Sequence, residues 1–286
     1  MGKISIIIPI YNGEQYIENL VRKIRNQHMD NFTLEIIAPV SNSMDKSYEL
    51  AKEYCDLAYI VSNFNHAKTR HEAALKSNGD VLVFITQDIL PYNEKWLSEL
   101  VSPLLDKSNN IVATYSRQVA YPDANYTEKL IREFNYPEYD RLCNSTTIEK
   151  WGRKNIFYSD SASATLREYF FDLGGYDFAV GTNEDVIYAL NVIESDYSVL
   201  YNSKSKVYHS HNFKFREAYS RYKLIGSFEK EYEHRLKKYS SLGEGKLLLK
   251  YLLVNLISKL KLKDLSILVL DLGTRYIAYK KGYNNS

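Results

Sequence analysis

The chain is poor in cysteine and has no long apolar run. Its 286 residues include only Cys55 and Cys143, which are far apart and lack the spacing of metal ligands. We therefore expect neither cysteine to be structural, and a reducing, cytosolic compartment fits best. A stretch of about 20 uninterrupted apolar residues, the signature of a transmembrane helix, does not occur. Residues 4–10 already read as a strand, so no signal peptide is expected.

An excess of charge of one sign is also lacking. Lysine and arginine total 37 against 35 aspartates and glutamates, a formal net charge of +2. This balance gives no signature of polyanion binding, so no nucleic-acid partner is expected. Tryptophan occurs twice, whereas tyrosine occurs 26 times. Aromatic faces and phenol groups suit sugars and protein interfaces, but a compositional habit of the source would explain the excess equally well.

Short apolar runs alternate with amphipathic stretches over the first 118 residues. The apolar runs predict strands over residues 4–10, 34–40, 57–61, 81–85 and 111–115. Helical periodicity predicts helices over residues 17–24, 45–55, 66–77 and 97–104. Regular alternation of strand and helix predicts an α/β fold with a doubly wound, mostly parallel sheet of the Rossmann-like kind.

Beyond residue 118 the pattern loosens. Residues 121–151 are polar, aromatic and irregular, and they predict no regular element. A strand is expected over Ser161–Leu166, and a helix over Glu184–Glu194, which Thr182 and Asp185 open as a variant capping box. His209-Ser210-His211 should end a short strand, and residues 216–286 should form a lysine-rich helical extension.

Asp88 follows the buried apolar strand at residues 81–85. The carboxyl edge of an open α/β sheet is where ligands bind. One Asp together with a diphosphate can hold Mg²⁺ or Mn²⁺, which prefer carboxylate and phosphate oxygens. The structural alternative is a turn residue or a helix cap.

Two further groups offer acid–base and ligand chemistry. Asp185, beside Glu184, lies in the first turn of the expected helix, where the helix dipole keeps it ionised and able to accept a proton. A merely favourable acidic start to the helix is the alternative. His209 and His211 alternate along the chain and should point to one side, where imidazoles can ligate an ion or bond to phosphate. Packed histidines remain an equal alternative.

A basic cluster opens the helix at residues 66–77. His66, Lys68 and Arg70 lie in its first two turns, a place suited to a diphosphate. A solvated helix face explains Lys68 slightly better.

In this order, the segments resemble the family-2 glycosyltransferases of the GT-A fold over residues 3–215. The resemblance begins with SIIIPIYN at residues 5–12, which matches the opening strand and nucleotide-contacting turn. Asp88 matches the last acidic residue of the metal-binding DxD motif. Glu184-Asp185 matches the acidic pair whose second member is the base, and His209 matches a metal- or phosphate-contacting histidine.

Finer features resemble a rhamnosyltransferase branch that builds bacterial surface polysaccharides such as capsule or O-antigen. They are Asn65-His66, Thr69-Arg70, Thr86-Gln87-Asp88 with Pro91, Ser116-Arg117-Gln118, Phe134-Asn135-Tyr136-Pro137 and His209-Ser210-His211-Asn212.

The resemblance implies an inverting, metal-dependent hexosyltransferase with Asp185 as catalytic base and Mg²⁺ or Mn²⁺ as cofactor. The expected metal ligands are Asp88, His209 and His211. The expected nucleotide-sugar residues are Pro9, Tyr11, Asn12, Ser43, His66, Arg70, Gln87, Asp88 and Glu184. Residues 1–215 would be the GT-A domain, with a nucleotide-binding half at 1–118 and an acceptor half at 119–215.

The implied partners are a dTDP- or UDP-sugar donor, with dTDP-rhamnose the best fit, and a lipid-linked saccharide acceptor. The expected location is the cytoplasmic side of the cell membrane, as a peripheral protein. Leucine-rich faces and lysines between Lys246 and Tyr283, with Asp264 capping a second helix, would lie on an anionic leaflet. Packing on the catalytic domain, or on a second copy in a homodimer, explains them nearly as well.

Two departures from the family pattern matter. Thr86 replaces the first acidic residue of the metal motif, and no aspartate lies near Val40 and Ser41 to contact a pyrimidine ring, where only Ser43 and Asp45 keep the pattern. These departures keep a non-catalytic member of a polysaccharide assembly complex open, beside a UDP-hexose-dependent enzyme. A nucleotidyltransferase would need a glycine-rich loop after the first strand, which here has only Gly13.

Overall fold

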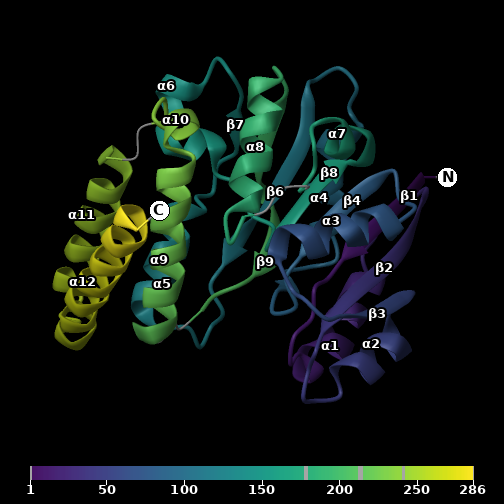
Figure 1. The fold of residues 1–286 in the computed structure, drawn as a ribbon, viewed down its shortest axis with the longest axis horizontal. Helices are drawn as coiled ribbons and strands as arrows, with labels where there is room; N and C mark the ends of the chain where they lie inside the picture. Colours follow the sequence, from purple (N-terminus) through teal and green to yellow (C-terminus); the bar gives the residue numbers. More distant parts are fainter. Residues whose placement is uncertain (1, 177–179, 212–214, 240–241, 286) are drawn as a thin grey trace.

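The computed structural model describes residues 2–285 except 177–179, 212–214 and 240–241. Among the described residues, one nine-stranded sheet runs in the order β3-β2-β1-β4-β8-β6-β9-β5, and β7 also pairs with β9 (Figure 1). The strands are β1 Gly2–Ile7, β2 Phe32–Ser41, β3 Leu57–Val61, β4 Val81–Ile85, β5 Leu90–Pro91, β6 Ile111–Val119, β7 Arg141–Cys143, β8 Ala162–Leu166 and β9 Ser198–Tyr208.

The first four strands pair in parallel. Strand β8 runs antiparallel between β4 and β6, whereas β6 and β9 are parallel to each other. The α/β class and the mostly parallel sheet are therefore confirmed. The helices are α1 Glu14–Arg25, α2 Ser47–Tyr54, α3 His66–Lys76, α4 Trp96–Leu105, α5 Tyr126–Asn135, α6 Ile148–Trp151, α7 Arg167–Asp172, α8 Glu184–Glu194, α9 Phe215–Glu231, α10 Glu233–Leu236, α11 Leu242–Ser258 and α12 Leu262–Asn284, with a 3-10 turn at Gly152–Ile156.

Two apolar cores lie on opposite faces of the sheet, because successive side chains of a strand point to opposite faces. Ile4 and Ile6 of β1 pack with residues of α1 and α4 in one core. Ile7 and Phe84 belong to the other core, with residues of α3 and α8. This two-sided burial explains why the central strands are continuous apolar runs.

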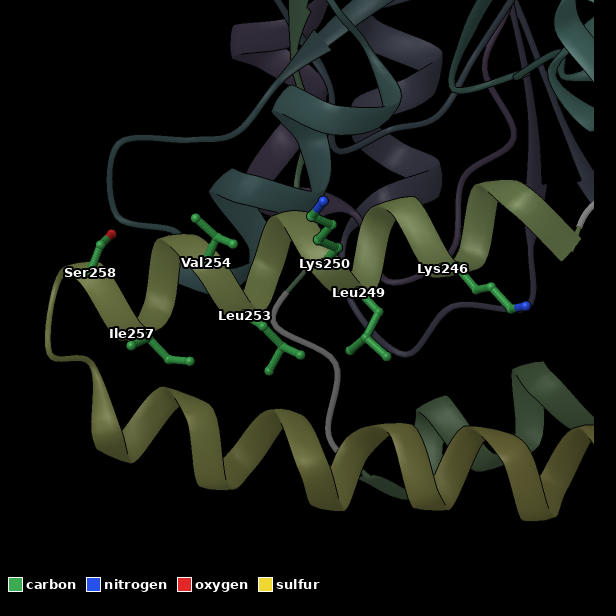
Figure 2. Close-up of a pocket in the computed structure, with 7 residues that line it drawn as sticks. All are labelled: Lys246, Leu249, Lys250, Leu253, Val254, Ile257 and Ser258. Carbon is green, nitrogen blue, oxygen red and sulfur yellow. The ribbon is translucent and has the colours of Figure 1, made fainter.

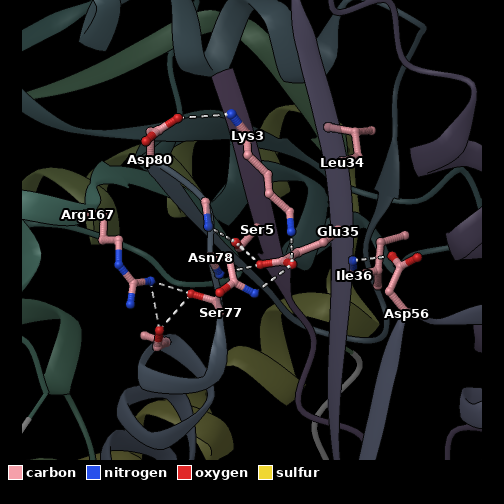
Figure 3. Close-up of polar contacts among 12 residues, drawn as sticks. Lys3, Ser5, Leu34, Glu35, Ile36, Asp56, Ser77, Asn78, Asp80 and Arg167 are labelled. Atoms are coloured by element: carbon pink, nitrogen blue, oxygen red, sulfur yellow. Dashed lines mark hydrogen bonds and ion pairs between the residues drawn. The ribbon is translucent and has the colours of Figure 1, made fainter. Parts of the chain in front are cut away.

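A buried polar network holds the amino-terminal edge of the sheet. Glu35 on β2 accepts hydrogen bonds from the Ser5 hydroxyl at 2.6 Å and the Asn78 amide at 2.5 Å (Figure 3). The Lys3 ammonium lies 2.5 Å from the same carboxylate. Burial by itself raises the pKa of Glu35, but these three partners outweigh it and lower the pKa to about 2.

Within the C-terminal helical extension, α12 packs on α9, and α11 packs on α5 (Figure 1). A small separate core of Leu130, Leu252, Leu256 and Leu268 joins α5, α11 and α12. Among the described residues, no helix combines the length and hydrophobicity that crossing a bilayer requires.

Four local predictions were wrong. Residues 121–151 are not irregular, because they contain α5, β7 and α6. Strand β9 is not short but spans 11 residues. Helix α8 has no capping box, since its N-cap is Asn183 with a left-handed φ of 62° and no side-chain hydrogen bond. Asp264 lies inside the first turn of α12, whose N-cap is Lys261. Asn212, part of the run that carries the family resemblance, lies outside the described residues.

Candidate active site

A polar rim forms where β1, β2 and β4 end, at the carboxyl edge of the sheet. The Tyr11 amide donates to Gln87 Oε1 at 2.9 Å, and Gln87 Nε2 donates to the Tyr11 carbonyl at 2.9 Å. Asn12, with φ of 45°, donates its amide to Ser43 Oγ at 3.0 Å. Pro9 precedes this turn and is partly exposed. Five residues predicted to bind the nucleotide-sugar therefore lie on one rim.

Asp88, the residue after Gln87, forms a cluster with His209 and His211. Each offers one ligand atom, and these atoms all lie within 4.8 Å of one another. His209 Nε2 lies 3.7 Å from Asp88 Oδ1, and His211 Nδ1 lies 3.5 Å from Asp88 Oδ2. The residues come from the loop after β4 and the segment after β9, so the parallel course of the sheet brings them to one edge.

The tautomer of His209 follows from Gln118. Gln118 Nε2 donates to Ser159 Oγ at 2.9 Å, so its Oε1 is the acceptor that faces His209 Nδ1 at 2.7 Å. Nδ1 therefore carries the proton, and the lone pair of Nε2 faces the Asp88 carboxylate. Buried His209 Nε2 has no hydrogen-bond partner among the described residues. Two acceptors that face each other at this distance fit a cation between them.

The protonation states of the cluster also fit a divalent ion. Burial lowers the pKa of His209, and burial followed by the neighbouring His209 lowers the pKa of His211 to about 4, so both imidazoles are neutral. Burial alone would raise the pKa of Asp88, but the two imidazoles, which carry positive charge in acid, outweigh it and hold the pKa below its ordinary value, so Asp88 is ionised where both imidazoles are neutral. One carboxylate and two neutral imidazoles form a donor set suited to Mn²⁺.

Aromatic and polar neighbours fix the loop that carries Asp88. The Tyr121 hydroxyl donates to the Asp88 carbonyl at 3.0 Å, and the Tyr121 ring stacks on Tyr208 at 5.6 Å between centroids. A hollow of about 410 Å³ opens beside the cluster. It is lined by Tyr16, Asp88, Tyr121, Asp123, Ala124, Ser210, His211 and Glu217.

A second group of acidic residues surrounds Arg70. Arg70 Nη1 donates to Glu184 Oε1 at 2.9 Å, and Arg70 Nε lies 3.7 Å from Asp160 Oδ2. Asp160 is buried and accepts hydrogen bonds from Tyr176 and Ser163, and its pKa is raised to about 6, chiefly by burial. Two carboxylates thus share one guanidinium, and the charge of Asp185, the residue after Glu184, lies within range of it.

Asp185 is basic for a carboxylate. Its pKa is raised well above the ordinary value by burial first, then by the negative charges of Glu184 and Asp160. The side chain accepts one hydrogen bond, from the Val186 amide at 2.9 Å. Asn183, in front of the acidic pair, holds a left-handed conformation that non-glycine residues rarely adopt, and such strain clusters at functional sites.

Polar contacts run from the ion cluster toward the acidic group. From His209 they run through Gln118 and Ser159 to the Tyr136 phenol. Asp185 in turn acts on the pKa of this phenol through its negative charge. The positive charge of Arg221 on α9 lowers the pKa of His66, His209 and His211 alike, so all three histidines lie within range of one guanidinium.

Arg70 and Glu184 are more deeply buried than the rim residues predicted to bind the nucleotide-sugar. Both are buried and paired with each other, so the guanidinium faces carboxylates. Arg70 Nη1 also lies 3.2 Å from Nδ1 of His66, another residue predicted to bind the nucleotide-sugar. Lys68 is exposed and pairs with Glu72. The basic cluster is therefore split between a buried and a solvated residue.

Four site residues were missed as functional residues. Gln118 and Arg132 hold His209, Asp160 faces Arg70, and Arg221 lies near three histidines. Arg132 had a usable signal, because Asn125 followed by Glu128 marks a helix start, and the Asn125 side chain does accept the Glu128 amide at 2.8 Å. Asp160 precedes an expected strand and gives no local signal.

The fold and the site together define a glycosyltransferase of the GT-A type, and solved structures agree with the fold. The mannosyltransferase PcManGT from Pyrobaculum calidifontis, in complex with GDP-Man and Mn²⁺, superposes with a TM-score of 0.60 at 16% identity, over 98% of this chain and 84% of that chain. TarS 1-349 of S. aureus in complex with UDP-GlcNAc gives a TM-score of 0.58 at 14% identity, over 87% and 79%.

Sequence comparison shows the family. Residues 5–174 match Glycosyl transferase family 2, and the chain belongs to this family. It is 32% identical over 230 residues to the O-antigen chain rhamnosyltransferase RfbN of Salmonella typhimurium, covering 79% of this chain and 72% of that protein. The O-antigen chain rhamnosyltransferase WbaN of Salmonella anatum is also 32% identical, over 232 residues, covering 80% and 72%.

Proposed function

We propose that the protein is an inverting rhamnosyltransferase that transfers rhamnose from dTDP-rhamnose to a lipid-linked saccharide of a bacterial surface polysaccharide. The observation that carries the proposal is the ion-ligand cluster of Asp88, His209 and His211, from which polar contacts run to the Tyr136 phenol, within range of the charge of the basic carboxylate Asp185. The names of the two relatives at 32% identity support the sugar and the polysaccharide.

The donor nucleotide would lie along the rim at the carboxyl edge of the sheet. Tyr11 is 59% exposed and offers an aromatic face to a base. Asp45 would not contact the nucleobase, because its carboxylate accepts hydrogen bonds from the Glu14 amide and the Ser47 hydroxyl. The rim therefore leaves Tyr11, Asn12 and Ser43 to contact the nucleoside, and His66 to contact the diphosphate.

The donor set of the cluster would hold Mn²⁺ or Mg²⁺, and two imidazoles favour Mn²⁺. The bound ion would offset the charge that grows on the departing nucleoside diphosphate. Thr86 replaces a carboxylate of the family motif, and the two histidines supply the missing ligands.

Asp185 would take the proton of the acceptor hydroxyl. The hydroxyl oxygen forms a bond to the anomeric carbon while the bond from that carbon to the diphosphate breaks, so dTDP leaves and the configuration inverts. A raised pKa makes Asp185 a stronger base than an ordinary aspartate. Arg70 would hold Glu184 and Asp160 in place and limit the repulsion that raises this pKa.

The C-terminal helices would hold the protein against the inner face of the cell membrane. An apolar hollow of about 600 Å³ runs along α11 and is lined by Lys246, Leu249, Lys250, Leu253, Val254, Ile257 and Ser258 (Figure 2). In Figure 2, Leu249, Leu253 and Ile257 point toward the side of α12. Apolar residues bordered by lysines are the composition of a helix that lies on an anionic leaflet.

A donor screen tests the proposal. Hydrolysis and transfer would be measured with dTDP-rhamnose, other dTDP-sugars and UDP-hexoses, with Mn²⁺ and with a chelator. We expect dTDP-rhamnose to be used fastest, and its use to fall sharply with the chelator and in Asp88→Asn. Faster use of a UDP-hexose would show that the donor is a UDP-hexose and not dTDP-rhamnose. Undetectable nucleotide-sugar binding by calorimetry, with and without Mn²⁺, would favour a non-catalytic assembly protein.

A further inference from the structure

A second hollow is lined in part by His211 and by none of the residues of the polar rim. It has a volume of about 350 Å³, at the lower end of the range of small-ligand sites, roughly 300–1,000 Å³. Its lining comes from α5 and its N-cap, the segment after β9, the first residue of α9, and α12. The residues are Asn125, Thr127, Glu128, Ile131, His211, Phe215, Asp264, Ile267, Leu268, Asp271 and Arg275.

This hollow is built onto the ion cluster. His211 lines both this hollow and the one beside Asp88. Glu128 accepts from the His211 amide at 3.3 Å, and Arg132 donates to Glu128 at 2.7 Å while it contacts His209. One end of a molecule in this hollow would therefore lie beside the ion and the reacting sugar.

The charges of the lining select the kind of ligand. Glu128 is paired with Arg132, and Asp271 is paired with Arg275 at 2.6 Å. Asp264 has no hydrogen bond or ion pair with any described residue, so the lining carries one uncompensated negative charge. This charge disfavours phosphates and acidic sugars, which the half-buried Asp264 carboxylate repels. A neutral sugar instead offers hydroxyl donors to it.

The apolar part of the lining fits the same ligand. Ile131, Ile267 and Leu268 present aliphatic surface, and Phe215 presents an aromatic ring. Sugar rings have C–H faces that such surfaces cover, while hydroxyls at the ring edge bond to carboxylate and hydroxyl groups. Thr127 adds one hydroxyl to the polar side.

From these contacts we propose that the hollow between α5 and α12 binds a neutral sugar residue of the acceptor. The proposal rests on the proposed function, since it names the acceptor side of the same site. Asp264 would accept a hydrogen bond from a ring hydroxyl, and Ile267 would cover the ring face.

The test uses the methyl glycosides of galactose, mannose and rhamnose as probes, and methyl glucuronide as an acidic control. Saturation-transfer NMR would be recorded on the full chain and on Ile267→Trp, Asp264→Asn and Ser266→Trp. Ile267 is 44% exposed, so the tryptophan fills the hollow without entering the core. Ser266 is its exposed neighbour outside the lining, which makes Ser266→Trp the matched control.

We expect at least one neutral glycoside to bind the wild type and Ser266→Trp equally. In Ile267→Trp and Asp264→Asn its Kd should rise at least about tenfold, because the tryptophan occupies the hollow and the asparagine removes the charge that strengthens the hydrogen bond. No neutral glycoside binding, equal binding to Ile267→Trp, or equal binding of the glucuronide would overturn the inference. Calorimetry of dTDP with Mn²⁺ on the same samples tests the proposed function separately, because neither substitution touches the donor rim.

Discussion

At the scale of single residues, Asp185 matters most for the proposed chemistry. It heads α8, next to a strained Asn183, and its pKa is raised by burial and by two neighbouring carboxylates. A catalytic base is most effective when its pKa approaches the working pH. The acidic group around Arg70 therefore raises the pKa of Asp185, while Glu184 and Asp160 stay paired with the guanidinium.

Asp185→Asn should remove the base and leave the donor site intact. Donor binding should stay near normal, and turnover should fall at least about 100-fold, the lower bound for general-base help. Calorimetry with dTDP and Mn²⁺, and initial rates of transfer, would measure the two effects. Glu168→Gln, an exposed carboxylate on α7, is the control. Turnover of Asp185→Asn close to that of the wild type would remove Asp185 from the mechanism.

Glu35→Gln should destabilise the fold in a way that depends on pH. The pKa of Glu35 falls from 4.5 to about 2 on folding, so the native state favours the ionised form. Its contribution, about 2 kcal/mol, is fully present above pH 4.5 and is lost as the pH falls toward 2. Urea unfolding of both proteins at pH 7 and pH 3 would measure it, with Glu53→Gln on α2 as an exposed control. A difference that grows toward pH 3 would contradict this account.

Residues at strand ends could be predicted from sequence, whereas their supports could not. Asp88 and the histidines follow apolar strands, and the sheet edge gathers such ends. Gln118 and Arg132 act on His209 across more than 75 positions of chain, and no local pattern marks such a contact. The pairing of Asp160 with Arg70 could not be predicted for the same reason. Only the assembled fold brings the segment before β8, which holds Asp160, to Arg70 on α3.

At the scale of elements, the junction of α9 and α12 depends on two glycines. A Cβ on Gly226 would lie 2.1 Å from the Tyr279 carbonyl, and one on Gly282 would lie 1.9 Å from the Lys223 carbonyl. Both helices therefore approach closely enough for backbone to contact backbone. Gly273 on α12 has no heavy atom within 4 Å of its Cβ position and faces open space.

Gly282→Ala and Gly273→Ala should change stability in opposite directions. The first forces α9 and α12 apart and should cost about 1–3 kcal/mol, the usual cost of overpacking. The second replaces a glycine in a helix interior and should add about 0.5–1 kcal/mol. Thermal unfolding followed by circular dichroism would measure both. Equal effects of the two substitutions would mean that α9 and α12 do not pack as the structure has them.

Long periodic elements of this chain were predictable, and elements dominated by aromatic and polar residues were not. Helix α8 and the strands β1 to β4 carry clear apolar patterns, and their predicted positions agree with the structure. Helix α5 was missed because its core face rests on Leu130, while Glu128 and Arg132 turn toward the site. Strand β9 was underestimated because a break in its register against β6, between Ser116 and Arg117, hides the alternation.

At the scale of the whole molecule, charge and exposed apolar surface are concentrated at one end. Residues 242–286 carry eight Lys and Arg against three Asp and Glu, a formal net charge of +5, so the rest of the chain is at −3. Half of the exposed large hydrophobic side chains of the described residues lie on α11, α12 and the turn between them. Helix α12 also lines the hollow beside His211, so the same element borders the site and the exposed apolar face.

This distribution predicts binding to anionic membranes through α11 and α12. Val269 and Ile277 are 61% exposed on one face of α12, so Val269→Asp with Ile277→Asp should abolish binding without entering the core. Flotation with vesicles containing phosphatidylserine would measure it, with Ile60→Asp on β3 as the control. Each lysine near such a surface contributes about 1 kcal/mol, so binding should weaken in high salt and on neutral lipid. Equal flotation of the double variant and the wild type would contradict membrane binding. A wild-type dimer in solution that the double variant breaks would assign the apolar face to a second copy of the chain instead.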